Sequence, residues 1–505
     1  MTDGPDPRDG EAIARLRAAF ESAGFTEDGA QEALKIDIAS RGEILDVQVY
    51  ERRVRDDSPL HTLIKLFLLG SVVPADRARA AFDPLSLEDA QALGLVAEAG
   101  GGVRRTVSIT MVAGLWLAHD SFVRDPGRMR PDHVIGAGPA SRTLAMLTVR
   151  RPVARALDLG TGCGVQALVA ARHAEHVVGT DINARALRFA EFNATLNGLG
   201  NVECREGSLY EPVAGERFDL IAANPPFIIS PERRFEYRDG GMPGDQISRE
   251  VVRRAGEHLA PGGFASVLCN WAHRGVEDWQ EPVRGWVEGT GCDAWVLRGD
   301  TQDPLGYAAT WLSVHRRDRY GAALDRWLEY YARLGVGAIS TGTVIMRRRT
   351  DGAPSGWFRG EHLPGTRASD ATEHLLRMFR NQDYLELAGN DEEVLDGAYR
   401  VTTDHRIDQT LALREGGYEL ERVTVRFERG LSFSGTADGF ILGVLAGCDG
   451  THPLRDLVRA VAPAMEVDAG KLEPAAVEIV RQMLSLGFLE APAPGPASPP
   501  GSDRD

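Results

Sequence analysis

The sequence predicts an α/β centre, a doubly wound sheet of parallel strands, between two smaller domains. From residue 154 to about 314, strand-like apolar runs alternate with helical patterns, which is typical of a sheet with helices on both faces. Helical spacing dominates before this region, and the regular alternation stops after residue 334. A chain of 505 residues is also too long for one ordinary core, so two or three domains are expected.

The composition is typical of a globular protein. Hydrophobic residues make up 43% of the chain and charged residues 26%, and no apolar run reaches the length of a transmembrane helix. The acidic, Pro- and Gly-rich first residues carry no signal-peptide pattern, so we expect a cytoplasmic protein with no membrane partner. The formal net charge of −16 disfavours non-specific binding of nucleic acid.

Cysteine and histidine usage predicts neither a disulfide framework nor a metal site. The five cysteines are scattered and include no C-x-x-C pair, which suits a reducing compartment. The twelve histidines show no spacing typical of zinc ligands, so we expect no metal.

Residues 11–130 are predicted to form a helical, winged-helix-like domain. Apolar residues recur at helical spacing from the start of this range and again over residues 60–69. Ser86 begins a Ser-x-x-Asp cap of a further helix. The runs 95–97 and 103–109, separated by glycines, predict a hairpin. Such a domain suits either nucleic-acid contact or plain docking.

Residues 330–490 are predicted to form a C-terminal α+β domain, also winged-helix-like. Strand patterns cover residues 335–348, 399–401 and 419–427, and helical patterns cover residues 437–446, 453–462 and 474–486. The Pro- and Gly-rich ends, residues 1–10 and 491–505, are predicted to be disordered.

The first chemical motif is a glycine-rich turn after a buried strand. Asp158 stands near the strand end, and Gly160, Thr161, Gly162 and Gly164 lead into a helix. Glycines are needed where a ligand approaches the backbone closely. Such a turn also occurs in dinucleotide-binding folds, but a carboxylate at Asp158 suits the cationic amino group of a methionine moiety better than a pyrophosphate.

Two further segments complete a nucleoside-binding pattern. Asp181 ends the next strand, about 20 residues past the glycine turn, where a carboxylate can accept hydrogen bonds from both ribose hydroxyls. The simpler alternative is that Asp181 only caps the following helix. Ile182 is expected against the adenine face, and Ser208 with Leu209 at the adenine edge.

The quartet Asn224-Pro225-Pro226-Phe227, directly after the strand 218–223, determines the reaction class. The prolines remove amide donors and leave carbonyls free to accept. Hydrogen bonds from a planar nitrogen to the Asn224 side-chain oxygen and the Pro225 carbonyl would localise its lone pair and aim it at a methyl group. Phe227 would stack on the planar group. The alternative is a Pro-rich turn with no catalytic role.

Taken in this order, the motifs of residues 133–314 resemble those of the class I S-adenosylmethionine-dependent methyltransferases of the small-domain type. The resemblance implies a Rossmann-like core over residues 131–320 and S-adenosyl-L-methionine as cofactor. The residues it assigns to catalysis are Asn224, Pro225 and Phe227. Those it assigns to the cofactor are Asp158, Gly160, Thr161, Gly162, Asp181, Ile182, Ser208, Leu209 and Asn224.

The motifs specify the methyl acceptor less closely than they specify the cofactor. The resemblance implies either a protein glutamine amide, as in release factors, or a guanine or adenine of ribosomal RNA, so the expected partner belongs to the translation apparatus. Residues 238–245 are similar to a Gly-Gly-x-x-Gly segment of the glutamine enzymes, whereas Phe227 is commoner than Tyr in the RNA enzymes.

Two further alternatives concern the chain as a whole. A cluster of arginines after the quartet suits either a solvated helix face or a substrate groove. These are Arg233, Arg234, Arg238, Arg249, Arg253 and Arg254. A module that binds the cofactor without catalysis remains the alternative of another class, and it predicts decay of the motifs, which are intact.

Overall fold

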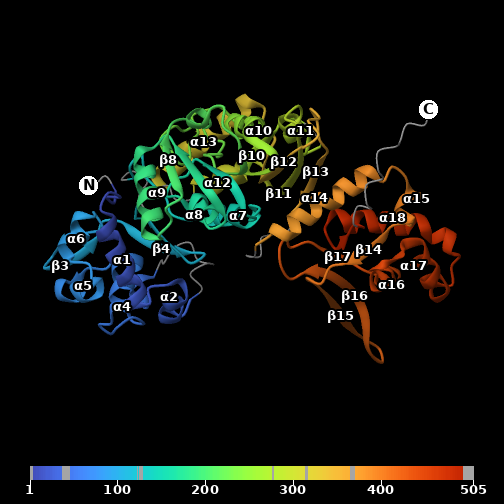
Figure 1. Cartoon of the computed structure of the whole chain (residues 1–505), viewed down its shortest axis with the longest axis horizontal. Coiled ribbons are helices and arrows are strands. Elements are labelled where there is room, and N and C mark those ends of the chain that lie inside the picture. Colours follow the sequence, from blue (N-terminus) through green and yellow to red (C-terminus); the bar gives the residue numbers. More distant parts are fainter. Residues whose placement is uncertain are drawn as a thin grey trace, which may run out of the picture. The chain divides into compact units, whose positions relative to one another are not determined.

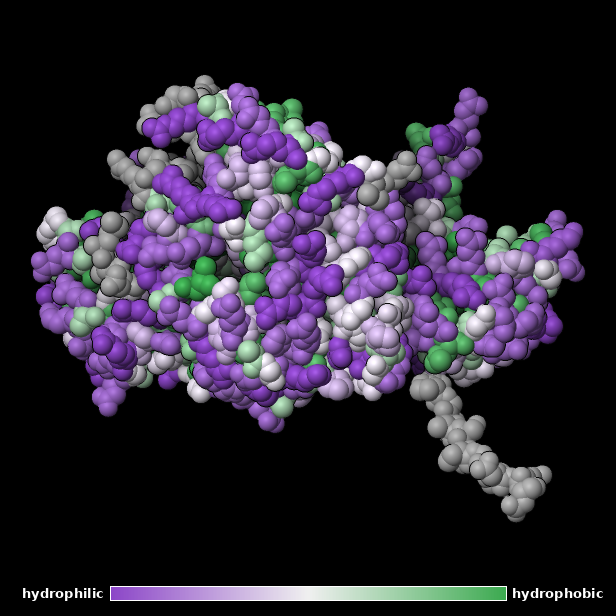
Figure 2. All heavy atoms as spheres, turned by 90° about the horizontal axis from the view of Figure 1, so that it is seen from above, coloured by the Kyte–Doolittle hydropathy of each residue, from purple (hydrophilic) through white to green (hydrophobic). Residues whose placement is uncertain are grey.

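The computed structural model divides the chain into two compact units, Met1–His362 and Leu363–Asp505. The residues that it describes are 4–36, 46–121, 123, 129–275, 278–312, 317–363 and 370–492. In this described part, no helix combines the length and the apolar character that a membrane span requires. The face drawn in Figure 2 is largely hydrophilic, with hydrophobic residues in small groups.

The first unit begins with a helical domain that carries a small sheet (Figure 1). Its helices are α1 (Gly10–Ala23), α2 (Glu27–Leu34), α3 (Val47–Glu51), α4 (Pro59–Leu63), α5 (Ala75–Phe82) and α6 (Leu87–Ala92), and a π-helical turn, Ile64–Leu69, continues α4. Its strands lie in the order β1 (Val73–Pro74), β3 (Gly102–Arg105), β2 (Val96–Ala99). A helix, a strand, two helices and a hairpin follow one another, which is the winged-helix-like arrangement that the sequence predicted.

Local signals for this domain agree with its structure. The apolar residues that recur along α1 are buried in its core: Ile13, Leu16, Ala19 and Phe20. Ser86 caps α6, because its hydroxyl accepts a hydrogen bond of 2.9 Å from the backbone N–H of Asp89.

The predicted strand 103–109 is divided in two. β3 ends at Arg105, and β4 (Ser108–Val112) pairs instead with β5 (Leu115–His119) in a separate hairpin. Thr106 still contacts the residues directly before β2, because its backbone N–H donates to the Leu95 carbonyl at 2.9 Å and its hydroxyl donates to the Gly94 carbonyl. The chain leaves β2 only after this residue.

The prediction of disorder over residues 1–10 is wrong for residues 4–10. The Asp6 amide donates to the Leu93 carbonyl at 3.0 Å, Asp9 caps α1, and the backbone of Gly4 passes close to the Phe189 ring. Polar capping and one close backbone approach are enough to order a segment that its composition marks as a loop. Residues 1–3 and 493–505 lie outside the described residues.

The centre of the first unit is a sheet of eight strands. They lie in the order β13 (Phe358–His362), β11 (Cys292–Gln302), β12 (Ala338–Arg348), β10 (Leu259–His273), β9 (Phe218–Ala223), β6 (Val153–Leu159), β7 (Ala174–Asp181), β8 (Val202–Glu206). β12 runs antiparallel to both of its neighbours, whereas the other pairs are parallel. The sheet is therefore mixed rather than wholly parallel.

The central domain also extends farther than the sequence predicted. The run 335–348 was assigned to the C-terminal domain, but it forms β12 and lies between β10 and β11. An apolar run satisfies the side-chain pattern of any buried strand, so the pattern does not identify which sheet it joins.

Helices cover both faces of this sheet, as predicted (Figure 1). One face carries α7 (Pro139–Leu147), α8 (Val165–Ala170) and α9 (Ala184–Leu196), and the other carries α10 (Gln246–His258) and α11 (Glu281–Val287). Two further helices, α12 (Pro304–Leu312) and α13 (Arg317–Leu334), form a separate apolar cluster near the end of β10.

The β4–β5 hairpin joins the N-terminal domain to α9 through two asparagines. Asn193 Oδ1 accepts from the Ala118 amide at 2.7 Å and its Nδ2 donates to the Ala118 carbonyl at 2.9 Å. Asn197 makes the same pair of bonds with Trp116, at 3.0 and 2.8 Å. The spacings match, because four helical residues rise about 6 Å and two strand residues about 6.6 Å.

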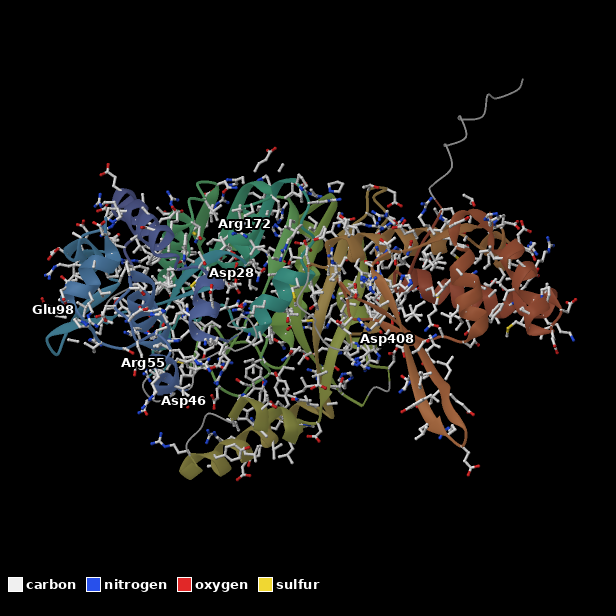
Figure 3. All side chains as sticks on the ribbon, turned by 90° about the horizontal axis from the view of Figure 1, so that it is seen from below. Asp28, Asp46, Arg55, Glu98, Arg172 and Asp408 are labelled. Atoms are coloured by element: carbon white, nitrogen blue, oxygen red, sulfur yellow. The ribbon has the colours of Figure 1, made fainter. Side chains whose placement is uncertain are left out.

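The hairpin makes a second contact with the central domain at its turn. Arg172, labelled in Figure 3, donates to the carbonyls of Ala113 and Gly114 at 2.6 and 3.1 Å. Beside the turn, the Trp116 indole donates to the Phe25 carbonyl at 2.6 Å. The hairpin thus fixes the N-terminal domain on α9 and α8 at several points.

The described part of the second unit contains five helices and a small antiparallel sheet, and the first two helices precede the sheet in the chain. The helices are α14 (Thr372–Leu387), α15 (Asp391–Leu395), α16 (Gly439–Gly447), α17 (Leu454–Val461) and α18 (Ala469–Ser485), and the sheet has the order β18 (Asp449–Pro453), β14 (Ala398–Val401), β19 (Leu489–Glu490). The predicted helices and strands after residue 398 are confirmed. The middle strand of this sheet, β14, precedes α16, α17 and α18 in the chain, whereas the middle strand of the N-terminal sheet, β3, follows the helices of its domain.

A long hairpin is inserted between β14 and α16. It consists of β15 (His405–Arg414) and β16 (Gly417–Phe427), with the short β17 (Ser434–Thr436) beside β16. One face is apolar and exposed at Leu411, Leu413, Tyr418 and Leu420. The other face is polar, and Asp408 on it pairs with Arg426 (Figure 3).

The asparagine contact gives a test of how the N-terminal domain is attached. Asn193→Ala would leave the buried Ala118 amide and carbonyl without partners, at a cost of about 2 kcal/mol. We expect hydrogen–deuterium exchange of the β5 amides to accelerate about 30-fold. Thr195→Ala, on the exposed face of the same helix, is the control and should change exchange little. Unchanged exchange in Asn193→Ala would contradict the role given to this side chain.

Candidate functional site

The site lies where two neighbouring parallel strands end. β6 pairs with β9, and Leu159 stands beside Ala223 in the register. Gly160 and Asn224 therefore leave the sheet next to each other. β6 has β7 on its other side, and β9 has β10 on its other side, so the connections diverge at this point. Ligands of open α/β sheets bind at such a divergence, outside the carboxyl ends of the strands.

The glycine turn after β6 is open to a ligand. Gly160 and Gly162 have φ of +75° and +55°, which disfavours any residue with a Cβ atom. Among the described residues, no atom lies within 4 Å of where those Cβ atoms would stand. The Gly160 and Thr161 amides donate to the Thr180 carbonyl at 2.9 and 2.8 Å, so the turn is held against the end of β7.

Asp158 holds this turn from beneath. It is buried, and its Oδ2 accepts from the Thr161 hydroxyl at 2.7 Å and from the Ala167 amide at 2.8 Å. No described residue donates to Oδ1. Burial raises the pKa of Asp158 to about 6. The carboxylate thus braces the turn through Oδ2, whereas its contact with a cationic amino group stays a prediction.

Asp181 joins the glycine turn to the end of β7. Its Oδ2 accepts from the Gly162 amide and its Oδ1 from the Asn183 amide, both at 2.9 Å. Burial raises its pKa, and these backbone N–H groups oppose the rise. Each oxygen keeps a lone pair, so the carboxylate can still accept from a diol. The cap of α9 is Asn183 and not Asp181, which contradicts the simpler alternative for Asp181.

An apolar ledge borders this carboxylate. The Ile182 side chain is 55% exposed, although it is large and apolar. Ser208 is also exposed, on a turn whose Gly207 amide donates to the Asp181 carbonyl at 3.0 Å. Leu209 has φ of +48°, a strained conformation for a residue other than glycine. A planar ring of a ligand would cover Ile182 and meet Ser208.

The quartet after β9 presents two acceptors. Asn224 Nδ2 donates to the Ser141 hydroxyl at 3.4 Å, which leaves Asn224 Oδ1 available to accept. The Pro225 carbonyl accepts from the Phe227 amide at 2.7 Å and retains a second lone pair. The Phe227 ring packs against the apolar cluster of Leu144, Ala222 and Leu268 and is half-buried.

The segment 238–245 packs directly on the quartet. Asp239 forms a β-bridge with Phe227. A Cβ atom at Gly240 would stand 2.9 Å from the Pro226 carbonyl oxygen, so glycine is required there. The same segment lines a small cavity of about 80 Å³ with Ile228, Ser230 and Tyr330.

Two tyrosines that the sequence analysis missed hold the chain just past the quartet. The Ile229 amide donates to the Tyr307 hydroxyl at 3.2 Å, and the Tyr331 hydroxyl donates to the Ile229 carbonyl at 2.8 Å. Asn270, buried on β10, donates to the Tyr307 hydroxyl at 2.6 Å. These residues come from α12, α13 and β10, and no local pattern connects them to the quartet.

The arginine cluster is separated by the fold. Arg238 is buried and pairs with Asp239 at 2.8 Å and with Glu232, so its role is structural. Arg253 and Arg254 line a surface depression of about 620 Å³ at the opposite edge of the sheet, together with three glutamates. Arg233 and Arg234, just after the quartet, and Arg249, near the start of α10, are exposed. The cluster therefore forms no continuous basic groove.

Three family models match the chain. Residues 138–278 match the methyltransferase small domain, and residues 22–106 and 376–491 match two domains of unknown function, DUF7059 and DUF7782. A release factor glutamine methyltransferase of Geobacter sulfurreducens is 38% identical over 172 residues, 31% of this chain and 57% of that protein.

Two other relatives match the same region. A release factor glutamine methyltransferase of Xylella fastidiosa is 39% identical over 129 residues, 23% of this chain and 47% of its own. A ribosomal protein uL3 glutamine methyltransferase of Bradyrhizobium diazoefficiens is 36% identical over 156 residues, 28% of this chain and 47% of its own. The chain thus spans about half the length of the curated relatives it matches.

The open glycine turn, the buried Asp158, the partly buried Asp181 and the exposed Ile182 thus lie at the carboxyl ends of β6 and β7. The same region carries the family match. Residues 138–278 are accordingly a class I methyltransferase small domain, and its family and relatives imply S-adenosyl-L-methionine as the cofactor.

Proposed function

We propose that this protein is an N-methyltransferase that uses S-adenosyl-L-methionine to methylate the side-chain amide of a glutamine in a protein of the translation apparatus. The observation that carries the proposal is the pair of acceptors at the switch point. Asn224 Oδ1 and the Pro225 carbonyl stand at the end of β9, directly beside the glycine turn after β6.

These acceptors suit an amide nitrogen. Its lone pair is delocalised into the carbonyl and is a weak nucleophile, but its two N–H groups can donate to two fixed oxygens. Donation to Asn224 and Pro225 holds the nitrogen in one orientation and favours localisation of the lone pair. Phe227 offers an apolar surface on which the flat amide can lie.

The Ser141 hydroxyl gives the Asn224 amide its direction. Because Nδ2 donates to Ser141, Oδ1 is the atom left to face the substrate amide that would receive the methyl group. Gln166 in turn donates to the Ser141 carbonyl at 2.7 Å, so α7 and α8 brace the arrangement.

The cofactor-side residues divide the work of binding. Asp181 would accept from the ribose hydroxyls, Asp158 would face the cationic amino group, and Ile182, Ser208 and Leu209 would contain the adenine. When bound, S-adenosyl-L-methionine supplies an electrophilic methyl group on its sulfonium. Transfer of this methyl group would leave S-adenosylhomocysteine, and the amide nitrogen held by Asn224 and Pro225 would lose one proton to solvent.

A protein acceptor is favoured over RNA by two observations. The relatives named above modify glutamine in a release factor or a ribosomal protein. The formal charge of −16 disfavours binding of a phosphate backbone, and the Arg238 guanidinium is already paired with Asp239. Such substrates imply action in the cytoplasm.

Labelled methyl transfer tests the function. Purified protein and S-adenosyl-L-methionine with a labelled methyl group are added to lysate from cells that lack the protein. We expect label in protein that protease removes and ribonuclease does not, and a mass increase of one methyl group on a glutamine. Label in RNA alone would replace this proposal by the RNA one, and cofactor binding without transfer to any fraction would favour a non-catalytic module.

Asn224→Ala separates catalysis from cofactor binding. Loss of an oriented acceptor should lower kcat about 100-fold to 1,000-fold, while the Kd for S-adenosylhomocysteine changes less than about twofold. Ser141→Ala is the matched variant, because it keeps Asn224 but removes its orienting partner, and a loss of about tenfold in kcat is expected. Equal loss of binding and turnover in Asn224→Ala would contradict the assignment.

Asp158 predicts a pH dependence of cofactor binding. Its raised pKa means that the free site holds a neutral carboxyl group below about pH 6 and a carboxylate above it. Since the cationic amino group favours the carboxylate, affinity should fall as pH drops through 6, by up to about tenfold per unit. Calorimetric titration of the cofactor between about pH 5 and pH 8, on both sides of the Asp158 pKa, measures this change in affinity.

Asp158→Asn should remove most of this dependence. Asp181, whose pKa is also raised, is the other carboxylate of the site and would account for the remainder. An unchanged pH profile in Asp158→Asn would exclude the proposed contact with the amino group.

A further inference from the structure

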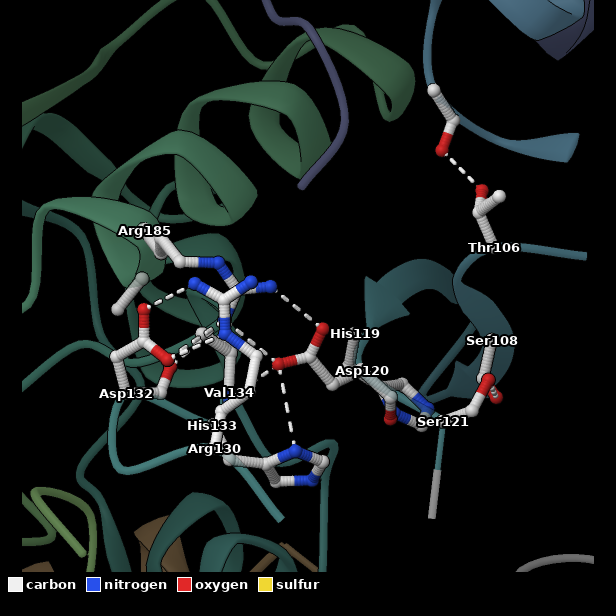
Figure 4. Close-up of polar contacts among 12 residues, drawn as sticks. Thr106, Ser108, His119, Asp120, Ser121, Arg130, Asp132, His133, Val134 and Arg185 are labelled. Carbon is white, nitrogen blue, oxygen red and sulfur yellow. Dashed lines mark hydrogen bonds and ion pairs between the residues drawn. The ribbon is translucent and has the colours of Figure 1, made fainter. Parts of the chain in front are cut away.

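Arg185 in the first turn of α9 links the cofactor loop to the N-terminal domain. Its two terminal nitrogens donate to both carboxylate oxygens of Asp120, at 2.9 and 2.8 Å. Asp120 directly follows β5, so it belongs to the segment that leaves the N-terminal domain. The two side chains are only 9% and 15% exposed, so the pair is shielded from solvent (Figure 4).

The same carboxylate organises the connecting segment. Asp120 Oδ2 also accepts from the Val134 amide at 2.9 Å, and the Asp120 amide donates to the Val134 carbonyl at 3.0 Å. His133 Nδ1 lies 3.5 Å from Asp120 Oδ2. The Asp132 carbonyl accepts from Arg185 at 2.8 Å. Residues 132–134 are therefore fixed between β5 and α9 (Figure 4).

From there the contacts reach the carboxylate of Asp181. Asn183 Nδ2 donates to the same Asp132 carbonyl at 3.1 Å. The Asn183 side-chain oxygen caps α9 by accepting from the Arg185 amide at 2.9 Å. The Asn183 amide donates to Asp181 Oδ1 at 2.9 Å. Asn183 is thus held from both sides, and its amide determines the direction of Asp181.

We propose that Asp120 and Arg185 are positioning residues for the cofactor: through Asp132 and Asn183 they aim the carboxylate that binds the ribose. The N-terminal domain then contributes to cofactor affinity as well as to the architecture. This inference rests on the cofactor assignment of the proposed function.

A purely architectural role would give a different result. The hairpin also contacts α9 at its far end, where Asn197 pairs with Trp116. This contact lies about four helical turns, or about 20 Å of rise, from Asn183. If Asp120 only attached the N-terminal domain, loss of either contact would affect the cofactor alike. If Asp120 positions Asp181, loss of the Asp120 contact alone should weaken binding.

The test compares variants by the Kd for S-adenosylhomocysteine, measured by calorimetry well below the unfolding midpoint of each. For Asp120→Asn we expect the Kd to rise about tenfold, and for Asn197→Ala to change less than about twofold. The double variant Asp120→Asn with Arg185→Met leaves no unpaired buried charge, so it should fold and still show the tenfold rise. Saturating cofactor should restore kcat in both.

A second readout follows the loop itself. Hydrogen–deuterium exchange of the amides from Asn183 to Ala186 should accelerate in Asp120→Asn and stay unchanged in Asn197→Ala. An unchanged Kd in both Asp120 variants, or an equal rise in Asn197→Ala, would overturn the inference. Asp181→Ala is the reference variant. If the wild-type protein binds no S-adenosylhomocysteine, the cofactor assignment itself fails. If the wild-type protein binds it and only Asp181→Ala loses binding, the cofactor assignment stands and the positioning role of Asp120 is contradicted.

Discussion

The parallel pairing of β6 with β9 is the contact on which the site depends. Because Leu159 and Ala223 stand side by side, the glycine turn and the quartet leave the sheet together. The surrounding elements act by holding one of these two loops. Asp158 and Asp181 hold the first, and Ser141 with the two buried tyrosines holds the second. Backbone geometry thus brings together the loops proposed to hold the methyl donor and the methyl acceptor, and side chains refine the orientation of these loops.

The electrostatics of this edge favour a cationic ligand. Burial raises the pKa of both Asp158 and Asp181, and the charge of Asp181 raises that of Asp158 further. Two shielded acids of like charge are unfavourable near each other without a cation. Amides of the glycine turn and of Asn183 offset part of this cost for Asp181. Binding of a positive group would offset the remaining electrostatic cost. The fold thus keeps two acids close together at the place where a cationic ligand would bind.

Patterns along the chain predicted the strands around the site, the capped helices and the order of the motifs, because each depends on neighbours a few residues apart. The Asn183 cap had such a local signal, an asparagine before a helix, and could have been found. The Asp120–Arg185 pair joins residues 65 positions apart, and Tyr331 lies 102 positions from Ile229. Contacts of that range leave no periodic trace in one sequence. The placement of β12 was missed for a related reason, since strand pairing is a tertiary choice.

The reversed strand β12 limits how the chain can be divided. It covers β10 from Phe264 to His273 and also pairs along β11. A fragment that ended at residue 320 would lose β12 and β13 and leave two long, apolar strands with open edges. Such edges associate with other chains, so the fragment would tend to aggregate. A fragment that contains the methyltransferase region should therefore extend to His362, the end of the first compact unit. The family match itself ends at residue 278.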